Sequence, residues 1–254
     1  MLLVAAATGL ELSAALGIRV QARQGELFAA SAYGRHMLAL VTGVGVVNAA
    51  LALGRALEQA RAEGTRADGT GADGVVCLGV AGSFDLEAHP LCCARLVERE
   101  TWPEYGLLFS GQCAADARAL GFSLNGAKAA APGAIFERLE WDGPGVARRM
   151  GLAPAGLFCA HSLTVSGVSA DPERAKALHE RFDAGLENME GFAMAYAAER
   201  VGLPFAELRT VSNPVGARPP AGWDLPGALA ALGVAAQNFL APTAGPVQNP
   251  QQRT

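Results

Sequence analysis

The sequence predicts a single α/β domain: a three-layer fold with a mixed, mostly parallel central sheet flanked by helices. Short continuous apolar segments, typical of strands buried on both faces, alternate with longer Ala- and Leu-rich segments that carry a polar face. Hydrophobic residues make up 51% of the 254-residue chain and charged residues 17%, enough apolar material for one well-filled core. Glycine, proline and asparagine separate the segments, as expected at turns.

The first half of the chain contains four expected strands and one clear helix. The strands are expected at residues 1–7, 37–42, 75–78 and 91–97, and the helix at 46–62. Gly/Asp/Thr-rich residues 64–74 indicate a loop, Gly79–Gly82 a turn that closes the third strand, and residues 100–107 another loop. No element can be assigned between residues 110 and 150.

The second half repeats the alternation. Strands are expected at 156–165, 186–189 and 203–212, and helices at 191–201 and 223–240. A further helix begins at Asp171-Pro172, because a capping residue followed by proline is the usual order at a helix start. The Pro- and Gln-rich residues 241–254 are expected to be a flexible tail, which leaves one domain over residues 1–240.

Composition disfavours several classes of function. The net charge is −4 and no Lys/Arg cluster is present, so nucleic-acid binding is not expected. No window approaches about 18 uninterrupted apolar residues, which argues against a membrane span. The five cysteines and four histidines show no metal-ligand spacing, and no dinucleotide or P-loop motif is present, so we expect neither metal nor cofactor. The odd cysteine count and the absence of a cationic leader favour the cytoplasm.

Unusual polar and glycine residues lie just after the expected strands. Ligands of α/β sheets bind at the carboxyl ends of strands, so these segments predict the site. They are residues 8–11, 42–45, 79–82, 164–169, 189–190 and 212–213.

Glu190, Asn213 and Glu11 are the candidates for chemistry. Glu190 precedes a helix, where a carboxylate could either cap the helix or accept hydrogen bonds from the two hydroxyls of a ribose. Asn213 precedes a proline and could be a turn residue, or an amide that meets the edge of a purine. Glu11 could be an exposed glutamate at a helix start, or a general base that orients a water molecule.

Three blocks of sequence resemble the nucleoside phosphorylase and nucleosidase superfamily. The residues Glu187-Asn188-Met189-Glu190-Gly191, followed by Pro204-Phe205 and by Arg209 through Asn213, resemble its "ME…PF…R.(I/V)S(D/N)" block. Residues 42–50 resemble its "GIGKVNAA" segment, and residues 79–82 its "GSAG" turn. The resemblance extends to about residue 240 and implies the superfamily's fold and a small-molecule nucleoside as substrate.

The resemblance also implies roles for individual residues. Glu190 would hold the ribose hydroxyls, Met189 would pack beneath the sugar, and Glu11 would orient the attacking water. Asn213 stands where adenine-cleaving relatives have an aspartate, and an amide there would serve N7 and O6 of a 6-oxopurine, with hypoxanthine favoured over guanine. Substrate-binding positions implied in the same way are Thr42, Gly43, Val80, Ala81, Gly82, Val168, Ala170, Asn188 and Met189. The apolar side chain of Trp102 is a further candidate for contact with the substrate.

Within the superfamily, the chain is most similar to the branch that removes hypoxanthine from a nucleoside with a carboxyphenyl-keto substituent at C5′, in menaquinone biosynthesis. Residues 102–107 are our candidate for contacting that substituent, and the same loop implies a homodimer or larger homo-oligomer. The rival functions are a purine nucleoside phosphorylase, a nucleosidase for methylthioadenosine or S-adenosylhomocysteine, and a non-catalytic nucleoside-binding module. Hydrolysis is favoured because the early loops lack the arginines that phosphate requires; Arg35 is a possible exception.

Overall fold

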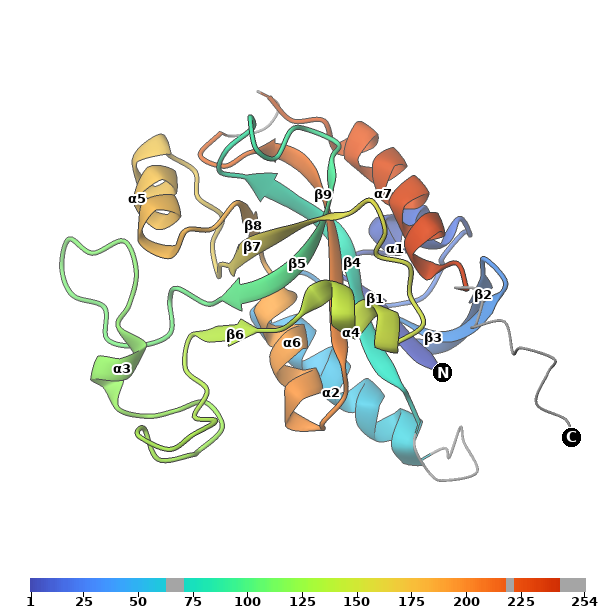
Figure 1. The fold of residues 1–254 in the computed structure, drawn as a ribbon, viewed down its shortest axis with the longest axis horizontal. Helices are drawn as coiled ribbons and strands as arrows, with labels where there is room; N and C mark the ends of the chain where they lie inside the picture. The colour runs from blue at the N-terminus through green and yellow to red at the C-terminus, as the bar shows by residue number, and fades with distance from the viewer. Residues whose placement is uncertain (63–70, 218–221, 243–254) are drawn as a thin grey trace, which may run out of the picture.

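The computed structural model describes residues 1–62, 71–217 and 222–242, and Figure 1 shows their arrangement. In these residues nine strands form one sheet and seven helices surround it. The strands are β1 (Leu2–Ala6), β2 (Leu27–Ala32), β3 (Arg35–Val41), β4 (Gly74–Ser83), β5 (Ala94–Thr101), β6 (Arg138–Glu140), β7 (Phe158–Thr164), β8 (Leu186–Asn188) and β9 (Phe205–Pro214). The helices are α1 (Gly9–Leu16), α2 (Val46–Ala62), α3 (Ala117–Leu120), α4 (Gly143–Arg149), α5 (Pro172–Phe182), α6 (Gly191–Arg200) and α7 (Leu225–Leu240).

The sheet is mixed, as predicted. Its order is β2-β3-β1-β4-β8-β7-β5-β6, and β9 pairs with both β4 and β5. The strands β3, β1, β4 and β9 are mutually parallel where they pair, so their carboxyl ends lie at the same edge. Because β9 bridges β4 and β5, the sheet curls on itself instead of lying flat. This curl brings β8 against the end of β4. The ends of β4, β8 and β9 then surround one cavity.

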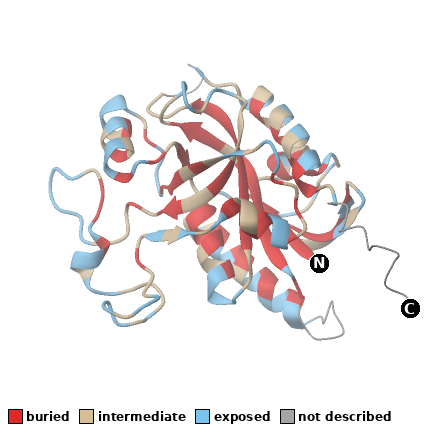
Figure 2. Ribbon diagram, in the orientation of Figure 1, coloured by how far each residue is buried: buried red, intermediate tan, exposed pale blue. Residues whose placement is uncertain are grey.

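Both faces of the sheet are covered. Side chains alternate across β1, so Leu2 and Val4 pack with α1, α4 and α7 on one face, while Leu3 packs with α2 and α6 on the other. Figure 2 shows the strands and the inner sides of these helices buried, and the outer sides of the helices exposed. Fully buried strands explain why the sequence shows continuous apolar segments instead of an alternating pattern.

Most expected elements are confirmed, but one turn is wrong. Residues 79–82 do not close a strand: they lie inside β4, whose ladder with β9 continues through them. Residues 100–101 likewise belong to β5. Gly9–Leu16 is a helix for which no bounds were predicted. The elements β2, β6, α3 and α4 were not expected.

Some expectations fall outside the described residues. Residues 243–254, most of the expected tail, and residues 63–70, most of the loop expected at 64–74, are not described. In the described part of the chain, no helix is both long and apolar enough to cross a bilayer.

Candidate active site

A cavity of about 300 Å³ lies where β1, β4, β8 and β9 meet the starts of α1, α6 and α7. Most of its lining is apolar, with a few convergent polar groups, which is the usual character of a small-molecule site. The predicted residues that line it are Glu11, Val80, Ala81, Gly82, Val168, Asn188, Met189, Glu190 and Asn213. Segments separated by up to two hundred residues therefore converge as the sequence predicted.

Four predicted substrate-binding residues are not part of this lining. Thr42 is buried, and its hydroxyl donates to the carbonyl oxygens of Ala6 and Gly43. Gly43 has a φ of +86° and packs on Gln24. Ala170 and Trp102 also lie outside it. The Trp102 ring stacks on Tyr105, with ring centroids 5.5 Å apart.

Glu11 is fixed at the first turn of α1. Its Oε2 accepts hydrogen bonds from the Thr8 amide (3.0 Å) and hydroxyl (2.8 Å), and Thr8 Oγ accepts from the Glu11 amide, so the two residues form a capping box. Its Oε1 accepts from the Val80 amide at 3.0 Å. Glu11 does lie at a helix start, but the residue is 6% exposed, so the expectation that it is exposed is wrong.

Glu190 occupies the N-cap position of α6 but makes no capping hydrogen bond. Asn188 Oδ1 instead accepts from the Glu190 amide (2.8 Å) and the Gly191 amide (2.7 Å), and Thr164 Oγ1 accepts from the next amide. These bonds satisfy the helix start, so the Glu190 carboxylate is left to face the cavity. The capping alternative for Glu190 is therefore wrong.

The Glu190 carboxylate is held by groups that are far away in sequence. Its Oε1 accepts from the Gly45 amide at 2.9 Å, and its Oε2 lies 3.6 Å from Nη1 of Arg209. Burial raises the pKa of Glu190, and the Arg209 charge opposes that shift. A carboxylate fixed on one side and open to the cavity on the other can receive two hydroxyl donors.

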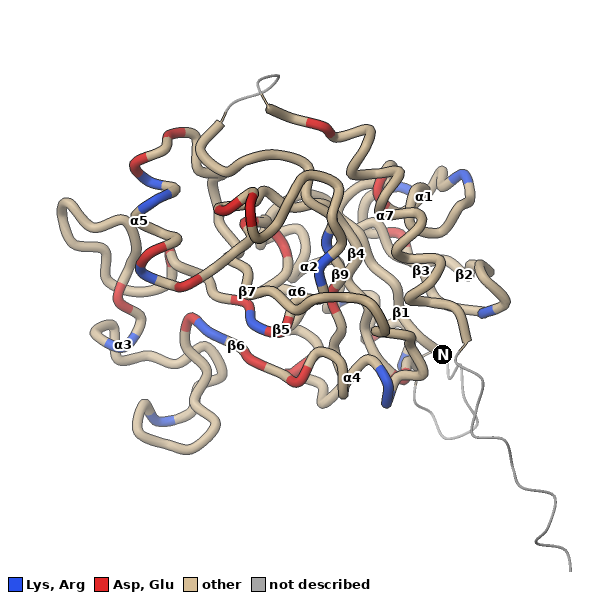
Figure 3. The backbone as a smooth tube through the Cα atoms, turned by 45° about the horizontal axis from the view of Figure 1, so that its top comes forward, with Lys and Arg blue, Asp and Glu red and all other residues tan. Residues whose placement is uncertain are grey.

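Arg209 is the central residue that the sequence left without a role, although it lies inside the recognised block. Its guanidinium is 2% exposed; Nε donates to Glu207 at 2.8 Å and Nη2 to Asn188 Oδ1 at 3.2 Å. Figure 3 shows that charged residues lie in the central strands as well as on the outer helices and loops. A buried arginine needs several carboxylate and carbonyl partners, because it has lost its hydration. Here Arg209 pairs with both Glu190 and Glu207 and so links the two carboxylates.

Arg209 and Glu11 also explain why residue 79 is glycine. A Cβ at Gly79 would lie 2.7 Å from Arg209 Nη1 and 2.9 Å from Glu11 Oε1. The glycine is needed for close approach within a strand, and not for the turn that the sequence suggested.

A second layer of carboxylates lies beneath Glu190. Glu100 and Glu207 are both 0% exposed, and Glu100 accepts from Asn188 Nδ2 and from Thr164 Oγ1, each at 2.6 Å. Burial and the neighbouring Glu207 charge raise the pKa of Glu100 well above the ordinary value. Oε2 of Glu207 has no hydrogen-bond partner in the residues that the structure describes, and burial raises the pKa of Glu207 as well, which favours a proton held by this pair of carboxyl groups. The Arg209 charge opposes the shift at both groups.

Asn213 has a fixed amide. Its Oδ1 accepts from Ser212 Oγ at 2.7 Å and its Nδ2 donates to the Pro214 carbonyl at 3.0 Å. Since an amide nitrogen carries two hydrogens, one N–H remains for a ligand in the cavity.

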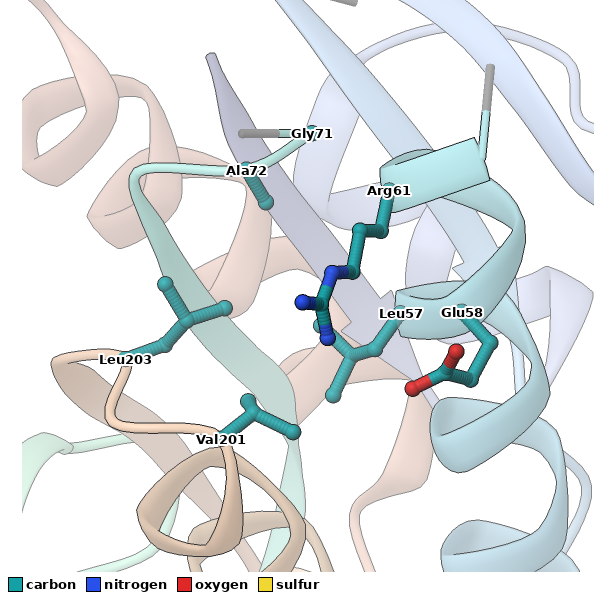
Figure 4. Close-up of a pocket in the computed structure, with 7 residues that line it drawn as sticks. All are labelled: Leu57, Glu58, Arg61, Gly71, Ala72, Val201 and Leu203. Carbon is teal, nitrogen blue, oxygen red and sulfur yellow. The ribbon is translucent and has the colours of Figure 1, made fainter. Parts of the chain in front are cut away.

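A separate hollow lies at the opposite edge of the sheet. It is formed by the end of α2 and the segments that precede β4 and β9, and Figure 4 shows Glu58 and Arg61 over the apolar side chains of Leu57, Val201 and Leu203. None of the predicted site residues lies there.

Comparison with known proteins agrees with the predicted family and fold. The family model described as "Phosphorylase superfamily" matches residues 2–241. A futalosine hydrolase of Thermus thermophilus is 37% identical over 226 residues, which cover 87% of this chain and 91% of that protein. A futalosine hydrolase of Streptomyces coelicolor is 52% identical over 71 residues, 28% of this chain and 30% of that protein. The chain therefore belongs to the phosphorylase superfamily and, within it, to the futalosine hydrolase family.

Solved structures show the same fold at low identity. A Campylobacter jejuni 5′-methylthioadenosine/S-adenosylhomocysteine nucleosidase superposes with a TM-score of 0.65 at 19% identity, covering 94% of this chain and 96% of that one. A futalosine hydrolase mutant of Helicobacter pylori superposes with a TM-score of 0.61 at 16% identity, covering 93% and 94%. The predicted fold class is confirmed.

Proposed function

We propose that this protein is a nucleosidase that cleaves the N-ribosidic bond of futalosine with water. The products are hypoxanthine and dehypoxanthine futalosine, in menaquinone biosynthesis. The observation that carries the proposal is the convergence of Glu11, Glu190 and Asn213 on one cavity. The identity to futalosine hydrolases over most of the chain supports the choice of substrate.

Glu190 binds the sugar. Gly45 and Arg209 hold its carboxylate from behind, so both oxygens can receive the 2′ and 3′ hydroxyls of the ribose. Cleavage proceeds through a transition state with oxocarbenium character at C1′, and the fixed negative charge stabilises the positive charge that develops there. Met189 lines the cavity beside Glu190 and packs beneath the sugar.

Glu11 orients the attacking water. Its carboxylate is held by the Thr8 and Val80 amides, so it can accept a hydrogen bond from water without reorganising. As the water attacks C1′ from the face opposite the base, Glu11 accepts its proton.

Asn213 stabilises the leaving base. Ser212 donates to its Oδ1, so the free Nδ2–H points at an acceptor, which N7 and O6 of hypoxanthine both provide. An amide is not an acid, and the proton that N7 takes up comes from water.

The C5′ substituent fits an apolar wall that differs from our candidate in the sequence. Residues 102–107 are not in the lining, whereas Leu10, Trp223, Leu225 and Leu229 line one side of the cavity. We assign the carboxyphenyl-keto group to this wall, because aromatic and leucine side chains complement its ring.

Phosphorolysis is the main rival. No Lys, Arg or His is among the described residues that line the cavity, and Glu11, Glu187 and Glu190 would repel phosphate. Arg35 is remote from the site, since it donates to the Leu240 and Gly151 carbonyls. A non-catalytic binding module is disfavoured because Glu11 and Glu190 are both positioned at the cavity.

The protein is further proposed to be a cytoplasmic homo-oligomer. Its five cysteines are free thiols, which suits a reducing compartment. Four apolar side chains at the starts of α1 and α2 are exposed beside the cavity: Leu10 (70%), Val44 (49%), Val47 (78%) and Leu51 (61%). A second copy would cover this apolar surface. Val47→Glu should then give a smaller species by light scattering, whereas Val234→Glu, an exposed valine on α7, should not.

The proposed activity is tested by base release. The protein is incubated with futalosine, inosine and methylthioadenosine, with and without phosphate, and with Glu11→Gln as the matched inactive control. Phosphate-independent release of hypoxanthine from futalosine is expected. Equal activity on inosine would contradict the pathway assignment, and a strict phosphate requirement would contradict hydrolysis.

A further inference from the structure

Glu187 is a buried carboxylate in the cavity wall that the proposed mechanism does not use. It is 6% exposed and lines the same space as Asn213 and Gly82. Side chains alternate along β8, so Glu187 lies on the opposite face from Asn188, which points into the buried network. Its carboxylate is held by Ser169, whose amide donates to Oε1 (3.0 Å) and whose hydroxyl donates to Oε2 (2.6 Å).

The strand register places Glu187 and Asn213 on either side of Gly82. Gly82 pairs with Glu187 on β8 and with Asn213 on β9, so the three residues form a row across neighbouring strands. Strands are about 4.8 Å apart, which separates the outer two Cα atoms by about 10 Å. The middle position has no side chain, and a Cβ there would lie 2.8 Å from Val215 Cγ2 and 3.1 Å from Asn213 Nδ2. Glu187 and Asn213 both line the cavity, which therefore offers a slot between a carboxylate and an amide.

The two ends of this slot have opposite hydrogen-bonding character. Asn213 presents an N–H donor, because Ser212 fixes its oxygen. Glu187 presents carboxylate oxygens, which accept and do not donate. A 6-oxopurine matches this pair along one edge, where N7 and O6 accept and N1–H donates. Adenine does not match, because its 6-amino group donates and its N1 accepts.

We propose that Glu187 is a specificity-determining residue whose carboxylate accepts the N1–H of a 6-oxopurine base while Asn213 donates to N7 or O6. This inference rests on the proposed function for the purine nucleoside as substrate. It adds a second contact to the base. This contact is at N1, which carries a hydrogen in hypoxanthine and none in adenine. A site with a buried acceptor discriminates strongly against a base that offers it no donor.

The bases themselves provide a test that does not depend on turnover. Binding of hypoxanthine, 1-methylhypoxanthine and adenine is measured by calorimetry on the full chain, on Glu187→Gln and on Ser169→Ala. The wild-type protein should bind hypoxanthine roughly 10- to 100-fold more tightly than 1-methylhypoxanthine, as for loss of a hydrogen bond to a charged group. In Glu187→Gln this ratio should fall towards one and adenine should bind at least as tightly as before, since Gln can donate to N1.

The glutamine variant keeps both contacts to Ser169, because an amide can accept from the Ser169 amide and donate to its hydroxyl. Its melting temperature should therefore stay close to wild type, and Ser169→Ala, which retains the carboxylate, should keep the preference for hypoxanthine. An unchanged ratio in Glu187→Gln would overturn the inference while leaving futalosine cleavage intact. If the binding ratios are as expected but futalosine is not cleaved, the proposed substrate is overturned and the role of Glu187 is supported. Failure of all three bases to bind would overturn both.

Discussion

The first and the sixth helix each begin beside a glutamate that faces the cavity, yet the two carboxylates are held differently. Glu11 takes part in the helix start itself, in a capping box with Thr8. Glu190 makes no bond to its own helix, because Asn188 and Thr164 supply those bonds. A glutamate that caps a helix is oriented by local sequence, whereas one relieved of capping must be oriented by distant groups, here Gly45 and Arg209.

This difference agrees with the work that each residue is proposed to do. A water molecule is small and must be placed at one point, so a carboxylate locked by local bonds suits Glu11. A ribose diol approaches through the cavity and needs both carboxylate oxygens, so a side chain free of its helix suits Glu190.

The largest effect is expected from Glu11→Gln. The amide cannot accept the proton of the attacking water, so kcat should fall by about 10²- to 10⁴-fold. Substrate affinity should change little, which equilibrium binding of futalosine to the variant would measure. An unchanged hydrolysis rate would remove Glu11 from the mechanism.

Glu190→Gln should follow closely, with kcat/KM reduced by about 10²- to 10³-fold because the charge that stabilises the oxocarbenium-like state is lost. Unlike Asn188, Glu190 does not cap α6, so thermal unfolding should stay near that of the wild-type protein. A marked fall in the melting temperature of this variant would contradict the conclusion that Glu190 serves catalysis and does not cap α6.

Asn188→Ala should show the reverse pattern. It removes the acceptor at the start of α6 and the donor to Glu100, which leaves several buried groups without partners. Unfolding should become easier by roughly 3 kcal/mol, about 6–12 °C in melting temperature. Calorimetry on this variant and on Glu190→Gln, side by side, would show whether Asn188 stabilises the fold while Glu190 supplies only the charge for catalysis.

Thr8→Val should have a smaller effect on the first helix. Loss of the capping hydroxyl costs about 1 kcal/mol, or about 2–4 °C for a chain of this size. Because the same hydroxyl holds Glu11, kcat should fall together with stability, whereas Thr8→Ser should preserve both. Loss of stability without any loss of kcat would show that the capping box does not serve the water-binding carboxylate.

The smallest effect on catalysis is expected from the proton held by Glu100 and Glu207 beneath Glu190, because this proton affects stability alone. Unfolded glutamates release their proton above their ordinary pKa of about 4.3, whereas the folded pair keeps a proton because its pKa is raised. Between the unfolded and the folded pKa the folded state therefore binds more protons than the unfolded state. Its stability falls as pH rises through this range. The slope is at most about 1.4 kcal/mol per pH unit. Glu207→Gln should flatten it, because the amide donates to Glu100 permanently and still accepts from Arg209. Denaturant titrations between pH 4 and pH 9 would measure the slope, and an unchanged slope would contradict a proton held by this pair.

The recognised blocks allowed much of the site to be predicted. Glu11 and Glu190 follow strands and Asn213 lies at the end of one, and strand ends meet in an α/β fold, so their convergence on one cavity was foreseeable. The sequence offered Glu11 as a residue of a helix start, but the capping box Thr8-x-x-Glu11 that buries its carboxylate was not recognised. By contrast, Trp102 was placed in the site from its apolar character alone, and that character fits its stack on Tyr105 equally well.

The sequence by itself determined the alternation of strands and helices, the identity of the chemical groups and their order along the chain, because hydrophobic periodicity and local turn residues are short-range properties. Only the tertiary structure decided that residues 79–82 continue a strand, since the partner that extends the strand, β9, lies more than a hundred residues away. It also decided which carboxylates face the cavity and which lie fully buried beneath it. That choice depends on burial and on the neighbours of each group across the sheet, such as Arg209 beside Glu190 and Glu207, and a linear pattern does not contain these.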